Sequence, residues 1–165
     1  MQYYIAYYVN GIKLGNIMKT KIHALAGITG FLTILMFWSS TLWSELFGTP
    51  ETIAWVKGLI LQGMFILIPT MAIVGASGMA LGKKCFHPLA KKKKKRMPII
   101  GANGLLILVP AAFYLEAQAA AGIFDTWFYA VQGIELIAGA INLTLMGINI
   151  RDGLRITRRS NRVRM

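Results

Sequence analysis

Apolar residues form four long segments along the chain, and few charges interrupt them. The segments cover about 22–47, 53–82, 98–122 and 127–150. A helix needs roughly 20 residues to cross a hydrocarbon core of about 30 Å, so each segment is long enough to span a membrane. The pattern predicts an all-α membrane protein with four transmembrane helices. Because two of the connections are short, it favours an up-down-up-down bundle.

Turn residues separate the segments. Gly48 and Pro50 break the chain between the first two, and the short turn IFDT at 123–126 precedes the fourth. Pro98 is a good residue for the first turn of the third helix. Pro69 and Pro110 lie near the middle of the second and third segments, where each removes a backbone donor and can kink its helix.

Positive charge collects between the apolar segments. The net charge is +12, and of 18 Lys and Arg residues, 3 precede Ile22, 8 lie in 83–96 and 6 lie in 151–164. Lys and Arg gather on the cytoplasmic side of membrane proteins. We therefore expect both termini inside, in a bacterial inner membrane with anionic lipids as neighbours. This placement argues against nucleic acid as a partner.

The charge pattern also divides the chain. The transmembrane domain is expected at 22–150, with a basic cytoplasmic loop at 83–97 and a basic cytoplasmic tail at 151–165. Residues 1–21 form a lead-in that either lies on the membrane or is an upstream extension, with Met18 as an alternative start. No cleavable signal peptide is evident.

Aromatic residues mark the expected outer boundary of the membrane. Trp38 and Trp43 lie towards the end of the first segment, Trp55 at the start of the second, and Trp127 at the start of the fourth. Trp favours the interface, where one side of the ring can stay wet.

Two histidines are candidate haem ligands. The predicted topology brings His23 and His87 to the same leaflet, and two neutral imidazoles are a ligand set for b-type haem. Glycines on the same helices leave room for a porphyrin beside each histidine, and nearby lysines could pair with the haem propionates. These residues are Gly27, Gly30, Gly75, Gly78 and Gly82, with Lys83 and Lys84. Cys85 with His87 could instead hold a soft metal, although two ligands are too few for structural zinc.

Ionisable residues form a second candidate site towards the outer side. Lys57 lies in the second segment, Glu116 in the third and Glu135 in the fourth, and Glu45 is nearby at the end of the first. Charges inside a membrane are costly and usually face the bundle interior as pairs. The group is either a static ion pair or a site for proton transfer.

One face of the fourth segment is polar. Gln132, Glu135, Gly139, Asn142, Met146 and Asn149 follow one another at spacings of three and four residues. Asn103 in the third segment is expected to meet this face. The stripe is either interhelical hydrogen bonding or a path for protons or a polar head group.

Four stretches of the chain resemble small four-span bacterial inner-membrane proteins that have no assigned activity. They are STLWSELFG at 40–48, VKGLILQGMFILIPTMAIVGASG at 56–78, KRMPIIGANGLLILVPAAFYL at 95–115 and FYAVQGIELIAGAINLTLMGINIRDGLR at 128–155. The resemblance implies four spans and a membrane location. In plan the chain is also similar to small four-helix b-type cytochromes, which usually carry their histidines within the spans.

Three functions remain open from the sequence. The first is an electron-transfer protein with haem b held by His23 and His87, in which the outer polar group is structural or serves a quinone and protons. The second is an accessory or assembly subunit of a larger membrane complex. The third is a small transporter or proton-relay protein. The motifs of soluble enzymes are absent, which favours a protein that is not an enzyme by itself.

Overall fold

The computed structural model describes residues 2–82 and 88–162, with side chains in 18–81 and 91–155. In this part of the chain every regular element is a helix: α1 (Gln2–Phe47), α2 (Pro50–Gly82), α3 (Pro88–Asn103), the π-helix η1 (Gly104–Leu108), α4 (Val109–Ala120) and α5 (Thr126–Arg162). The segments long and apolar enough to cross a membrane are Met18–Phe47, Pro50–Leu81, Lys91–Ala120 and Thr126–Arg155. The prediction of an all-helical protein with four such segments is confirmed.

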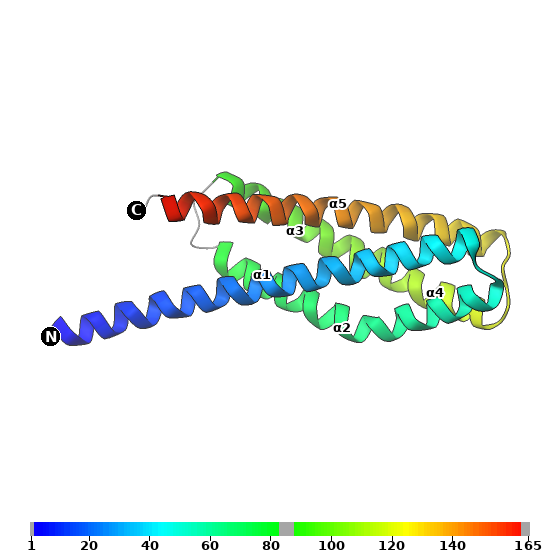
Figure 1. The fold of residues 1–165 in the computed structure, drawn as a ribbon, viewed down its shortest axis with the longest axis horizontal. Coiled ribbons are helices and arrows are strands. Elements are labelled where there is room, and N and C mark those ends of the chain that lie inside the picture. Colours follow the sequence, from blue (N-terminus) through cyan, green and yellow to red (C-terminus); the bar gives the residue numbers. More distant parts are fainter. Residues whose placement is uncertain (1, 83–87, 163–165) are drawn as a thin grey trace.

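The four segments pack as a bundle. α1 contacts α2 on one side and α5 on the other, and the third segment, made of α3, η1 and α4, lies between α2 and α5. The beginning of α1 and the end of α5 lie at one end of the bundle, whereas the connections after α1 and before α5 lie at the other (Figure 1). We call these the basic end and the connection end.

Several helices are longer than predicted. α3 begins at Pro88, so residues 88–97 of the expected loop are helical, and Pro98 lies inside a helix. Lys and Arg are good helix formers, and Pro88 suits a first turn. The described parts of the lead-in and of the tail are likewise helical continuations of α1 and α5.

Capping residues explain the short connections. Thr49 precedes α2, and the Thr52 amide donates to its Oγ1 at 3.4 Å. At the end of α4, Gly122 has a φ of 70°, and the Gly122 and Ile123 amides donate back to Ala119 and Gln118. This pair of bonds is a Schellman motif, which favours glycine. Asp125 then accepts the Phe128 amide at 2.8 Å and caps α5.

The two membrane prolines have different effects. Pro69 lies within α2 without ending it. Pro110 follows η1, in which the Val109 amide donates to the Gly104 carbonyl, five residues earlier. A π-turn before proline accommodates the donor that proline lacks. The third segment is thus continuous, but its hydrogen-bond pattern changes from α-helical to π-helical near the middle.

The buried core is thin and lies in three layers. The layer nearest the connection end contains Ile53, Leu115, Ala119 and Phe128, the middle layer Ile60, Met64 and Ala112, and the layer towards the basic end Ile34, Ile100 and Met146. Large apolar side chains elsewhere point outward, including Trp43, Trp55 and Trp127. An apolar exterior around a thin core suits a membrane-spanning bundle.

Candidate functional site

A buried ion pair joins α2 to α5. Lys57 Nζ lies 2.7 Å from Glu135 Oε2, and the side chains are 1% and 13% exposed. The two residues lie about 10 Å and about 14 Å along the axis from the starts of their helices, at 1.5 Å per residue. A pair at this depth is costly to desolvate, so its partners must compensate each other closely.

Two further side chains surround Glu135. Gln132, which is 3% exposed, donates from Nε2 to Glu135 Oε2 at 3.0 Å. Glu45 of α1 lies within electrostatic range of both Lys57 and Glu135. Glu45 Oε1 and Gln132 Oε1 are buried, and neither accepts a hydrogen bond within the described part of the chain. We call Glu45, Lys57, Gln132 and Glu135 the polar site.

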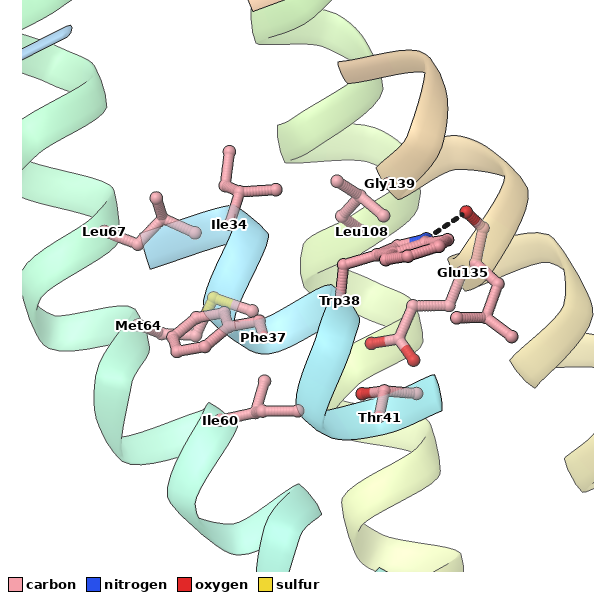
Figure 2. Close-up of a pocket in the computed structure, with 11 residues that line it drawn as sticks. Ile34, Phe37, Trp38, Thr41, Ile60, Met64, Leu67, Leu108, Glu135 and Gly139 are labelled. Atoms are coloured by element: carbon pink, nitrogen blue, oxygen red, sulfur yellow. Dashed lines mark hydrogen bonds between the residues drawn. The ribbon is translucent and has the colours of Figure 1, made fainter. Parts of the chain in front are cut away.

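A cavity of about 50 Å³ lies beside the polar site, and residues from all four membrane segments line it. Its wall is apolar except for Thr41, the Glu135 carboxylate and the Trp38 indole (Figure 2). A volume of this size holds a few water molecules but no organic substrate. The arrangement therefore places ionisable side chains beside a space of the size of a few water molecules.

The Trp38 side chain of α1 packs against α5. Its indole N–H donates to the Leu136 carbonyl at 2.9 Å, and its ring lies against Gly139. A Cβ at Gly139 would approach the Trp38 Cδ1 to 2.9 Å. Trp38 is thus a half-buried residue that closes the cavity against α5. The apolar pattern of α1 did not show that this face contacts α5, and the place of Trp38 at the membrane boundary stays a prediction.

Glu116 is not joined to the ion pair. It is half-buried on α4 and forms no ion pair with any side chain that the structure describes. Asn103 does meet α5, donating from Nδ2 to Asn142 Oδ1 and to the Ala138 carbonyl, each at 2.8 Å. Asn142 in turn donates to the Ile100 carbonyl at 3.4 Å.

The polar face of α5 is buried but discontinuous. Gln132, Asn142 and Asn149 all face the interior. Between Asn142 and Asn149, however, the layer of Ile34, Ile100 and Met146 fills the bundle. The stripe therefore consists of separate polar groups rather than a continuous hydrogen-bonded path.

A second ionic group, missed by the sequence analysis, lies nearer the basic end. The Arg96 guanidinium donates to Asp152 Oδ2 at 2.8 Å and to Asn149 Oδ1 at 3.4 Å, and Asp152 is buried. The spacing of three residues from Asn149 to Asp152 was the available signal, because it continues the polar face by one turn. This group holds α3 against α5.

The expected haem site is only partly described. His23 Nδ1 lies 2.9 Å from Ser77 Oγ, whereas His87, Lys83 and Lys84 lie outside the described residues. Beside His23, the Met97 side chain covers the position of a Cβ on Gly78. A porphyrin would have to displace Met97 there.

The other glycines of the expected haem site have different neighbours. Gly30 packs against Met71 and Met146, whereas Gly27 and Gly75 face open space. The described residues contain no group of three His, Cys, Asp or Glu side chains that would hold a metal ion. Haem binding stays a prediction.

No family model, curated protein or solved structure matches the chain. Its similarity to four-helix cytochromes is therefore not supported by these comparisons. Four long apolar helices fit a small four-span membrane protein, and the function must be argued from the polar site.

Proposed function

We propose that the chain is an up-down-up-down bundle in a bacterial inner membrane, with both termini in the cytoplasm. The charge distribution supports this orientation. Lys91, Lys92, Lys94 and Lys95 are exposed on α3, and Arg151 and Arg155 are exposed near the end of α5. All belong to the basic end, where an anionic cytoplasmic leaflet would attract them.

We further propose that the protein transfers protons through the polar site. The observation that carries this function is the buried Lys57–Glu135 pair beside a cavity large enough only for water. Ionisable residues inside a membrane protein mark proton relays, and a second carboxylate nearby disfavours the ionisation of both, so the group favours the binding of one proton. The cavity volume favours protons over an organic solute.

The core layers require this transfer to be gated. Phe128 and Leu115 lie on the connection side of the polar site, and Ile34 and Ile100 lie on its basic side. These apolar layers flank the buried Lys57–Glu135 pair on both sides. We infer that proton exchange at the polar site is gated by movement of the helices at one of these layers, which prevents an open leak.

Proton flux into liposomes tests the proposal. The protein is reconstituted with a pH-sensitive dye inside, and a potassium diffusion potential drives proton entry. We expect flux above that of empty liposomes, and a loss of at least tenfold in Glu135→Gln. Glu116→Gln is the matched control, because Glu116 has no partner among the described side chains and should retain the flux. Equal flux in Glu135→Gln and the unmodified protein would reject the proposal.

A further inference from the structure

We propose that Glu45 carries the exchangeable proton, while Glu135 stays ionised as the fixed partner of Lys57. This inference rests on the proposed function, because it names the group of the polar site that gains and releases the proton. It assigns the two carboxylates unequal roles from their hydrogen bonds.

Glu135 is held in its charged form. Its Oε2 accepts from the Lys57 ammonium at 2.7 Å and from the Gln132 amide at 3.0 Å. Both donors stabilise a carboxylate, and the first also supplies the opposite charge. A proton on Glu135 would compete with Lys57 for the same oxygen.

Glu45 has the opposite surroundings. Its Oε1 is buried and receives no donor from the described side chains or backbone. The charged groups near it are Lys57 of α2, whose ammonium already pairs with Glu135, and Glu135 of α5 itself. A second ionised carboxylate would leave the site with one excess negative charge and an unpaired buried oxygen. Both penalties disappear when Glu45 binds a proton.

Gln132 gives a second, independent indication that the site lacks a hydrogen-bond donor. Its amide N–H is used by Glu135, and its Oε1 is buried without a donor in the described structure. A neutral Glu45 adds an O–H group to this site, and an O–H group is a donor that the Gln132 oxygen can accept. The same oxygen can accept no hydrogen bond from an ionised Glu45.

The exchange is a simple acid–base step. The neutral Glu45 carboxyl loses one proton to water and becomes a carboxylate, and the reverse step restores it. Lys57 keeps its proton throughout, because its charge balances Glu135. A monovalent metal ion fits the site less well than a proton, since the Lys57 ammonium would repel it.

Infrared spectroscopy of the protein in liposomes tests the assignment. A protonated carboxyl group has a C=O stretching band that shifts in D₂O. We expect one such band near neutral pH that Glu45→Gln removes. Glu45→Asp should shift the frequency of the band, because the carboxyl group is then carried by a shorter side chain. Glu135→Asp and the control Glu116→Gln should leave the band at its original frequency.

The outcomes separate this inference from the proposed function. A band that moves in Glu135→Asp and stays in Glu45→Asp would place the proton on Glu135, and absence of any D₂O-sensitive band would also reject our assignment. In either case the flux that depends on Glu135 could remain. Conversely, a band that follows Glu45 in a protein without flux would leave the assignment standing and remove proton transfer.

Discussion

At the scale of single residues, the Lys57–Glu135 pair should be important for stability. Lys57→Met leaves the Glu135 carboxylate in the interior without its cation, so we expect a loss of about 3 kcal/mol. Unfolding in mixed micelles with increasing denaturing detergent measures it. The double variant Lys57→Met with Glu135→Leu should recover most of the loss, since it removes both charges. A double variant no more stable than Lys57→Met would show that the pair is not coupled.

The asparagine contact between the third segment and α5 should contribute less. Asn142→Leu removes the acceptor of Asn103 and the donor to Ile100, so we expect a loss of about 0.6–1.7 kcal/mol in the same unfolding experiment. Thr144→Val is the control, because Thr144 is exposed and, within the described residues, bonds only to the Ala140 carbonyl of its own helix. A larger loss in Thr144→Val than in Asn142→Leu would contradict this interpretation of the contact.

The sequence predicted some contacts of the polar residues and missed others for a geometric reason. The pairing of Lys57 with Glu135 follows from their depth and opposite charge, and the Asn103 contact follows from the helical period of α5. Glu116 could not be placed in this way. The π-turn at Gly104–Leu108 adds a residue, which rotates α4 by about 100° relative to α3.

At the scale of helices, α1 and α2 pack closely where a glycine leaves room. A Cβ at Gly63 would overlap the Phe37 ring, whereas a Cβ at Gly58 of the same helix would meet nothing within 4 Å. Gly63→Ala should therefore lower stability by about 1–3 kcal/mol. Gly58→Ala should be neutral or slightly stabilising, because alanine is the better helix former. Similar losses in both variants would show that glycine itself, rather than the Phe37 contact, is what matters.

Helix ends were harder to predict than helix existence. Apolar length was enough to find four segments, but hydropathy marks where a membrane would end rather than where a helix ends. α3 therefore begins at Pro88, three residues before the run of lysines at 91–95, and α5 continues to Arg162. The capped ends at Gly122 and Asp125 were nearer their predicted places, because glycine and aspartate act on the backbone locally.

At the scale of the whole molecule, the proposed orientation can be tested with single cysteines in a Cys85→Ser background. Ile123 is exposed at the connection end, and Lys92 is exposed at the basic end. A membrane-impermeant maleimide added to intact spheroplasts should label Ile123→Cys, because the periplasmic face of the membrane is then open to the medium. It should label Lys92→Cys only after the membrane is opened. The reverse pattern would overturn the orientation that we propose.

The exposed lysines of α3 should determine that orientation. Changing Lys91, Lys92, Lys94 and Lys95 together to Gln removes four positive charges but keeps Arg96, which holds Asp152 of α5. If these charges retain the basic end in the cytoplasm, the variant should insert in both orientations, so Ile123→Cys should be labelled only in part before the membrane is opened. Unchanged, complete labelling would instead show that these four lysines are not required and that the remaining Lys and Arg residues of the chain are sufficient to orient the bundle.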